Sequence, residues 1–341
     1  MIVDGVVSTF AGDGIAGYRD GPGATARFNH PTGVAVDASC NVFVCDSSNH
    51  RVRVITPGGV VTTLAGSGQA GFADGQGIAA RFNLPMDIAV DSQGDVFIAD
   101  YLNNRIRQIT IAEGDVTTIA AGSDCQYSYG LAVDHEGQVF FTERTTNRIR
   151  KITTGGSVST LAGGGTSGSV GGFQDGAAAD ARFNSPRGVA VDGDGNVFVA
   201  DLRNNRIRQV TPDGTVTTIA GSGASGSIDG LGTAASFDFP SGIAIDPDGN
   251  IIVTDHLSDR IRKIIAGLPP PQGPPQPEVA SSTYMEEMKS MLGDPTYSDV
   301  AFVVKHADDQ AGGVLRIRSR PTLNVVLLLC ASLSRMYGHS L

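Results

Sequence analysis

Short apolar runs, rich in Val and Ile, alternate with polar turns along the first 265 residues. One unit reads GVAV, a turn such as DGDGN, a second run VFVA, a turn such as DLRNN, and a third run RIRQV. The runs are too short for ordinary helices, and Gly, Asn and Asp punctuate every joint, which is typical of antiparallel strands connected by tight turns. The pattern therefore predicts a series of hairpins.

This three-strand unit occurs five times. Within each copy an Asp stands nine residues before an acid, and that acid stands five residues before an Arg, without exception. The copies begin at Pro31, Pro85, Ser128, Pro186 and Pro240. A repeat of fixed internal spacing predicts a rigid structural unit that stacks on its neighbours.

A fourth strand has its own signature, Val-x-Thr-(Leu/Ile)-Ala, which starts at Val61, Val116, Val158 and Val216. One more copy, VSTFA, occupies residues 7–11, before the first unit, and no fourth strand follows the last unit. Four strands per repeat of this length correspond to one propeller blade. We therefore predict an all-β, five-bladed propeller of four-stranded antiparallel blades, in which the N-terminal strand completes the last blade and closes the ring.

Length varies between the fourth strand of one blade and the first strand of the next. Four of these connections share a pattern, seen as DGPGATARFNHP from Asp20 and DGQGIAARFNLP from Asp74, and the third connection is short. In the shared pattern, the Gly after Asp suits a tight turn, and the Ala-rich middle suits one helical turn. Because strands alternate in direction, these connections and the hairpins between the acids and arginines should emerge on the same face.

Composition and charge agree with this fold and narrow the function. Of the 341 residues, 45 are Gly, which disfavours a coiled coil or a helical bundle. The net charge of −10 belongs mainly to the first part, where 19 basic and 28 acidic residues precede Gly267. An acidic propeller is a poor ligand for phosphate backbones or anionic membranes. The four cysteines form no CxxC pair, which favours a reducing compartment, and we expect a cytoplasmic protein, with the nucleus as the other compartment considered.

The blade sequences resemble the NHL repeat family. The resemblance rests on the NNRIR motif, the PxGVAVD start and the DGxGxAARFNxP insert, and it covers roughly residues 5–265. Propellers of that family are commonly six-bladed, whereas this sequence contains five copies. The resemblance implies recognition by the loops of one face, which in some family members bind RNA and in others form the site of a lyase or related enzyme.

The chain divides into three parts on composition. Residues 1–266 form the predicted propeller, residues 267–283 a Pro-rich linker, and residues 284–341 a tail. A short apolar helix pattern at YMEEMKSML followed by YSDVAFVV resembles the opening of the BTB/POZ domain, a dimerisation and adaptor module. About half of that domain's pattern is absent, so the tail is interpreted as a partial BTB/POZ-like region.

The repeated acids and arginines favour an architectural role over a ring-shaped binding site. Each acid ends one strand and each Arg begins the next, so the two are expected to meet across a hairpin and latch neighbouring blades. A motif present in every blade is what architecture requires. The predicted latches are Asp46 with Arg51, Asp100 with Arg105, Glu143 with Arg148, Asp201 with Arg206, and Asp255 with Arg260.

The variable hairpin tips are the candidate protein-binding residues. Exposed positions that differ between blades on a rigid scaffold are where recognition is usually found, although loop residues also drift without function. The candidates on the loop face are Ser48, His50, Tyr101, Asn104, Arg144, Arg203 and His256.

Catalytic and metal sites have little support in the sequence. There is no HExxH motif, nucleophile elbow or phosphate loop, so we predict no catalytic residues, no metal and no cofactor. One alternative stays open: His50 and His256 occupy hairpins of the first and last blades, which would adjoin in a closed ring and could hold a metal.

Two functional hypotheses follow. The first is a non-enzymatic interaction scaffold whose loop face binds a protein partner, with the BTB-like tail implying self-association or recruitment of a cullin-type ubiquitin ligase. The second is a metal-dependent lyase or lactonase-like enzyme with its site at the propeller channel. RNA binding and membrane binding are disfavoured by the negative charge.

Overall fold

A computed structural model describes residues 8–164 and 170–269 of the chain. The predicted BTB/POZ-like tail and all but the first residues of the predicted linker lie outside the described residues. No helix in the described ranges is long and apolar enough to cross a membrane.

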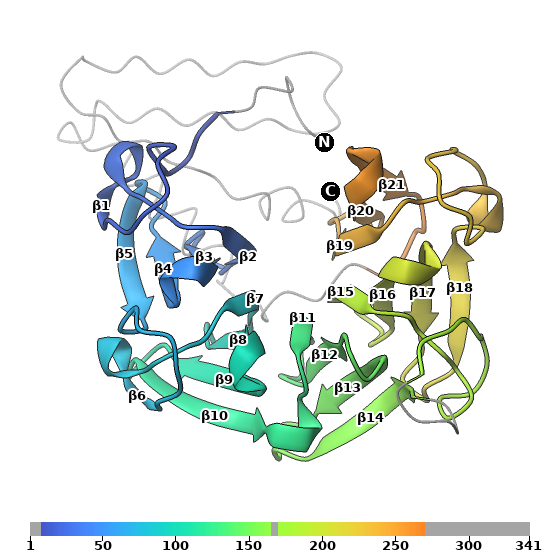
Figure 1. The fold of residues 1–341 in the computed structure, drawn as a ribbon, viewed down its shortest axis with the longest axis horizontal. Helices are drawn as coiled ribbons and strands as arrows, with labels where there is room; N and C mark the ends of the chain where they lie inside the picture. Colours follow the sequence, from blue (N-terminus) through green and yellow to red (C-terminus); the bar gives the residue numbers. More distant parts are fainter. Residues whose placement is uncertain (1–7, 165–169, 270–341) are drawn as a thin grey trace, which may run out of the picture. The chain divides into compact units, whose positions relative to one another are not determined.

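The described residues form five antiparallel sheets, one for each repeat (Figure 1). The first blade contains β1 Gly21–Pro22, β2 Pro31–Val36, β3 Val42–Asp46, β4 Arg51–Ile55 and β5 Val60–Ala65. The second contains β6 Gly75–Gln76, β7 Pro85–Val90, β8 Val96–Asp100, β9 Arg105–Thr110 and β10 Asp115–Ala121. The third contains β11 Ser128–Val133, β12 Val139–Glu143, β13 Arg148–Ile152 and β14 Val158–Gly163. The fourth contains β15 Pro186–Val191, β16 Val197–Asp201, β17 Arg206–Val210 and β18 Val216–Ala220, and the fifth contains β19 Pro240–Ile245, β20 Ile251–Asp255 and β21 Arg260–Ile264.

Single 3-10 turns complete the blades. Those on the connections between blades are η1 Gly23–Thr25, η3 Gly77–Ala79, η5 Gly122–Asp124 and η7 Gly232–Ala234. Those at the hairpin tips are η2 Ser47–Asn49, η4 Tyr101–Asn103, η6 Leu202–Asn204 and η8 His256–Ser258. The predicted strand order and the five-bladed architecture are confirmed.

Strand register is the same in every blade. Asp46 lies opposite Arg51 across β3 and β4, and the corresponding pair occurs in each of the other blades, as in Asp100 opposite Arg105. The strand next to the propeller centre carries an irregularity after its first residue, for example between Pro186 and Val189. The identical register explains why the acid-to-Arg spacing never varies in the sequence.

The hydrophobic core lies between successive blades. Figure 1 shows the order of these blades from β2 to β21. Phe43 and Cys45 of the first blade pack with Ile88 and Ile98 of the second, and equivalent clusters join the remaining neighbours. The Phe of each long insert takes part: Phe82, Phe183 and Phe237 are fully buried, and Phe28 is partly buried. Each blade is therefore stabilised by the next one.

Neighbouring inner strands approach so closely that Gly is required there. A Cβ on Gly188 would lie 2.5 Å from the carbonyl oxygen of Ser241, and one on Gly130 would lie 2.1 Å from that of Arg187. Four blades have Gly at this position, and only the second has another residue, Asp87. The repeat is thus broken at one point beside the propeller centre.

The structure differs from the prediction at ring closure. In the described ranges, the last sheet has three strands, and no strand of the first blade packs against it as neighbours do elsewhere; Figure 1 shows the two blades apart. The sheet faces of the first and last blades that would meet in a closed ring are therefore exposed to solvent. Val34 is 61% exposed where Ile88 of the next blade is 3% exposed, and Ile261 is 69% exposed where Ile207 is fully buried.

The N-terminal segment stays with the first blade. Val7 lies outside the described residues, and residues 8–11 belong to no strand. Ala11 packs against the cluster of Ala26 and Val61, and the Gly12 amide donates to the Gly23 carbonyl at 2.8 Å. The same bond recurs between Gly66 and Gly77 in the second blade. Residues 8–11 therefore keep their local contacts, and none of these four residues pairs with β21.

The first residues of the predicted linker contact the propeller. The Leu268 amide donates to the Gly249 carbonyl, the Gly193 amide donates to the Pro269 carbonyl, and Leu268 packs on the cluster between the fourth and fifth blades. Contacts with the propeller therefore extend to residue 269, and the division of the chain at residues 266 and 283 stays a prediction.

Candidate functional site

The hairpin tips and the loops that enter the inner strands lie on the same face, as predicted, and are bonded to each other. The Ser48 amide donates to the Asn29 carbonyl, and the Leu102 and Arg203 amides do the same to Asn83 and Asn184. We call the surface formed by these tips and entry loops the loop face. Its backbone is held rigidly, so side chains there project from fixed positions.

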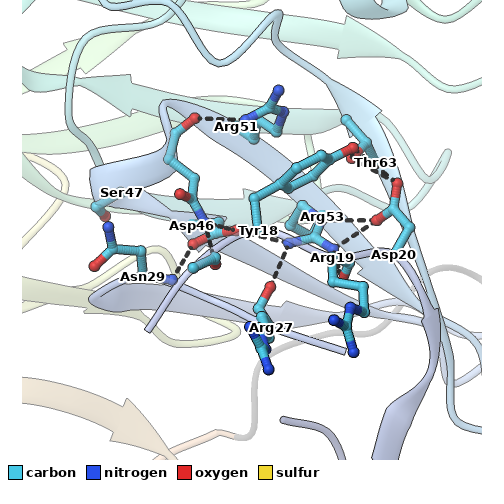
Figure 2. A network of polar contacts seen from close by, with 12 residues as sticks. Tyr18, Arg19, Asp20, Arg27, Asn29, Asp46, Ser47, Arg51, Arg53 and Thr63 are labelled. Carbon is cyan, nitrogen blue, oxygen red and sulfur yellow. Dashed lines mark hydrogen bonds and ion pairs between the residues drawn. The ribbon is translucent and has the colours of Figure 1, made fainter. Parts of the chain in front are cut away.

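A buried arginine, Arg53, joins the segments beneath the loop face in the first blade (Figure 2). Arg53, fully buried, pairs with Asp46 at 2.7 Å and with Asp20 at 2.5 Å, and it donates to the carbonyls of Arg19 and Arg27. One side chain thus joins the hairpin, which carries Asp46, to the insert that precedes the blade. We call this arrangement the arginine clamp.

The clamp recurs in every blade. Arg107, Arg208 and Arg262 each pair with the acid at the end of the middle strand and with the Asp that opens the insert, at distances of 2.5 to 3.1 Å. The acids concerned are Asp100 and Asp74, Asp201 and Asp175, and Asp255 and Asp229.

The third blade builds the clamp from a different sequence. Its short connection lacks the DGxG insert, but Asp124, in η5, reaches Arg150 at 3.2 Å, while Glu143 lies 3.5 Å from the same guanidinium. The requirement for two carboxylates on this arginine therefore survives the loss of the insert.

The predicted ion pairs between the acids and the first arginine of the next strand are wrong, because the acids pair with the second arginine of that strand. Asp46 does lie opposite Arg51, but its ion pair is with Arg53, two residues further on the same face of the strand. Arg51 sits at the strand end, where its guanidinium extends past the carboxylate, donates to the Ser67 carbonyl and stacks 3.8 Å above the Tyr18 ring. The other first arginines are placed similarly: Arg105 and Arg206 stack on Phe72 and Phe173, Arg148 lies beside Gly164, and Arg260 donates to the Ser227 carbonyl.

Burial perturbs the clamp carboxylates. Desolvation raises the pKa of Asp201 to about 6 in spite of the neighbouring Arg208, and it raises the pKa of Asp100 in the same way. Each carboxylate also accepts a backbone N–H from its own entry loop, from Asn184 and Asn83 respectively, both at 2.8 Å. The acids therefore bind loop backbone and arginine together, which is a structural role.

Two of the predicted binding residues are used to join blades. The last tip residue of each hairpin adopts a left-handed backbone. In the first four blades, its side chain accepts the amide of the next blade's entry loop. His50 accepts the Leu84 amide at 3.2 Å, and Asn104 accepts the Tyr127 amide at 2.9 Å. Asn147 and Asn205 bond in the same way to Ser185 and Phe239. This interblade staple removes His50 and Asn104 from the candidate binding surface.

The remaining candidates break the repeat and project from the loop face. Tyr101 is half-buried and forms an aromatic cluster with Tyr127 and Tyr129, with ring centroids 5.5 and 6.1 Å from its own. Arg144 and Arg203 have side chains without a hydrogen bond or ion pair to any described residue, and both line an open pocket of about 520 Å³. Ser48 lies 3.3 Å from the His30 ring, and His256 is exposed on the last blade.

Two further residues near the propeller centre were not identified from the sequence. Asp87 accepts the Leu131 amide of the next inner strand at 2.9 Å, and desolvation raises its pKa to about 7. Arg187 stacks 4.3 Å above the Tyr129 ring and donates to Ser241 at 2.9 Å. Both stand where the aligned repeats differ from one another, which is the signal that would have found them.

The described residues contain no group of three or more His, Cys, Asp or Glu side chains that could hold a metal ion. His50 is committed to the Leu84 amide, and the blades that carry His50 and His256 are not neighbours in the structure. The arrangement that motivated a shared metal site is therefore not formed by these two histidines.

Comparison with known families matches the blades. A model of the NHL repeat matches residues 28–55, 82–109 and 237–263, and a model of the Teneurin NHL domain matches residues 110–211 and 170–231. The first three ranges each cover the three repeated strands of a blade. The two models together reach every blade.

Relatives and solved structures are consistent with this match. NHL repeat-containing protein 2 of Bos taurus is 35% identical over 28% of this chain, and Teneurin-3 of Danio rerio is 30% identical over 89% of it. The chain spans only 14% and 11% of the length of these two proteins. An auxiliary nutrient binding protein from Bacteroides ovatus shares the fold, with 20% identity, a TM-score of 0.57, and coverage of 70% of this chain and 60% of its own.

The clamp predicts unequal roles for the two arginines of one strand. Arg208→Met should lower the free energy of unfolding by about 3 to 5 kcal/mol, because it leaves the buried Asp201 without its cation. Arg206→Met should cost about 1 kcal/mol, because this half-buried side chain loses one aromatic stack and two carbonyl bonds. Urea denaturation of both variants beside the parent chain measures the difference.

The Arg208→Met deficit should also be smaller at pH 5 than at pH 8. Without the cation, the already raised pKa of Asp201 rises further, so protonation relieves the buried charge at low pH. If Arg208→Met and Arg206→Met lowered the free energy of unfolding by the same amount, the clamp would be contradicted.

The interblade staple predicts a pH effect at His50. Burial, followed by the neighbouring Arg51, holds the pKa of His50 below its usual value, so the folded chain favours the neutral ring that accepts the Leu84 amide. The unfolded chain takes up this proton at a higher pH, so the contribution of His50, about 1 kcal/mol, is lost as pH falls below about 6.5. His50→Asn, which matches the staple residue of the next three blades, should lose less stability between pH 7.5 and 5.5 than the parent chain. Thermal melts at both pH values test this, and parallel pH profiles would show that His50 does not act as the acceptor.

Proposed function

Because its blades form an NHL-repeat β-propeller, we propose that the chain is a non-enzymatic scaffold whose loop face binds a protein partner. NHL propellers generally bind proteins, and such a partner needs a rigid surface whose exposed residues are specific to one chain. The observation that carries the proposal is the division between repeated and unrepeated residues. Repeated acids, arginines and asparagines are engaged in clamps and staples. Among the unrepeated tip residues, Arg203 and His256 are exposed, and Tyr101 and Arg144 are half-buried.

The aromatic cluster gives this surface its strongest candidate contact. Tyrosine supplies a large, rigid contact area with a polar end, and tyrosines are enriched among the residues that dominate protein interfaces. Tyr127 is 39% exposed and Leu102, beside Tyr101, is 42% exposed. Together they offer apolar area on a face whose backbone does not need to be ordered on binding.

The recruitment part of the proposal rests on sequence resemblance alone. If the BTB/POZ-like tail is active, the whole chain would act as a substrate adaptor, with the propeller selecting the target and the tail binding a cullin-type ubiquitin ligase or a second copy. Those residues lie outside the described part of the chain. We propose a cytoplasmic location on the same sequence grounds.

The enzymatic alternative has no specific observation in its favour. The candidate metal histidines are separated, and the perturbed carboxyl groups of the clamps are engaged by arginine and backbone amides. Perturbed pKa values of this kind arise in structural ion pairs as well as in active sites.

The proposal predicts that binding depends on the loop face and not on the opposite end of the same blade. Leu102 and Ile111 are both 42% exposed, Leu102 at a tip and Ile111 just after the far end of β9, so they form a matched pair. Proteins captured by the full chain are identified, purified and titrated against it by calorimetry. Tyr101→Ala and Leu102→Ala should each weaken binding tenfold or more, while Ile111→Ala binds as the parent chain does. Binding that is insensitive to both tip changes and lost in Ile111→Ala would refute the loop face as the site.

A further inference from the structure

A pocket on the loop face lies between the third and fourth blades. Arg144 and Thr145 of one hairpin tip, Ser185 of an entry loop, and Arg203 of the next tip line it, and its volume is about 520 Å³. The position of Arg144 is occupied by Ser47 in the first blade and by Tyr101 in the second, and the position of Arg203 is occupied by Leu102 in the second. This pocket therefore exists at one place among the blades. Two arginine side chains, Arg144 and Arg203, line this pocket.

These cations differ from most arginines of the propeller. The arginine of each clamp is paired with carboxylates, whereas the side chains of Arg144 and Arg203 bond to none of the described residues. None of the described residues that line the pocket carries a carboxylate. Two guanidinium groups beside one pocket repel each other, and a carboxylate that accepts hydrogen bonds from both removes the repulsion and forms charge-assisted bonds.

The aromatic cluster continues from this pocket. The Arg144 amide donates to the Tyr127 carbonyl at 3.5 Å, so the tip that carries Arg144 is joined to the loop that carries Tyr127. Arg187 connects the two regions below, because it stacks on Tyr129 and comes from the strand that follows Ser185. The surface thus has a cationic part and an apolar aromatic part side by side.

Resting on the proposed function, we propose that the partner presents an acidic segment to this surface, with its Asp or Glu carboxylates bound by Arg144 and Arg203 and a neighbouring apolar side chain against Tyr101 and Tyr127. The chain carries a net charge of −10, so most of its surface repels such a segment. At this pocket the positive charges of the two arginines attract the acidic segment. This local attraction fixes the position and direction of the bound segment.

Fluorescence anisotropy with a labelled peptide tests the proposal on the full chain. The probe is fluorescein-Glu-Asp-Glu-Glu-Phe-Leu, and its control is the neutral analogue fluorescein-Gln-Asn-Gln-Gln-Phe-Leu. The parent chain should bind the acidic peptide at least tenfold more tightly than the neutral one, and the preference should weaken between 50 and 300 mM NaCl.

A double variant and a matched control locate the binding. Arg144→Gln with Arg203→Gln should lower the acidic preference at least tenfold. Thermal melting should be unchanged and shows that the variant is folded, because these two side chains bond to none of the described residues. Arg81→Gln, which removes an exposed arginine outside the pocket, should bind as the parent chain does. Equal binding of both peptides by the parent chain, or full acidic preference in the double variant, overturns the proposal.

The outcome is separable from that of the proposed function. A partner whose binding is lost in Leu102→Ala but retained in the arginine double variant would support the loop face and overturn the acidic segment. If the partner binds Leu102→Ala and Tyr101→Ala as it binds the parent chain, while the parent chain prefers the acidic peptide, the acidic-peptide site would be supported and the loop face would be overturned as the partner's binding site.

Discussion

One buried arginine per blade is the interaction on which the rest of the propeller depends. Arg53 is fully buried, and it is stable there only because Asp46, Asp20 and two carbonyl oxygens surround it. A guanidinium removed from water without such partners would cost several kcal/mol, so the hairpin and the insert must both be in place before it can be buried. The clamp therefore couples the hairpin of a blade to the connection that precedes that blade.

Rigid tips allow the loop face to specialise. The staples from Asn104, Asn147 and Asn205 fix each tip to the next entry loop, and the clamps fix it to its own insert. Residues between these fixed points are free to vary without loss of fold. There the chain places a tyrosine cluster beside two arginines whose side chains bond to none of the described residues. Architecture and recognition are thus divided among positions only one or two residues apart.

Much of the fold could be predicted from the sequence because every blade repeats the same spacing. Five blades, their strands and the shared face of the tips follow from that repetition. The pairing of Asp46 could not, because Arg51 and Arg53 lie on the same face of one strand, and only the packing shows which guanidinium points inward. Asp124 could not be predicted either, since it fills the clamp from a segment that resembles no other insert. Ring closure was predicted from a balanced count of strands, but counting does not require that β21 and the N-terminal residues meet.

Native-state hydrogen exchange on the full chain tests the clamp most directly. The amides of Asn83 and Asn184 belong to entry loops, yet they donate to the buried carboxylates of Asp100 and Asp201. If the clamps hold the loop face, these amides should exchange as slowly as those of the central strands β9 and β17, through unfolding of the blade. Exchange as fast as that of an open surface loop would contradict the account, because the tips would then open independently of the arginines beneath them.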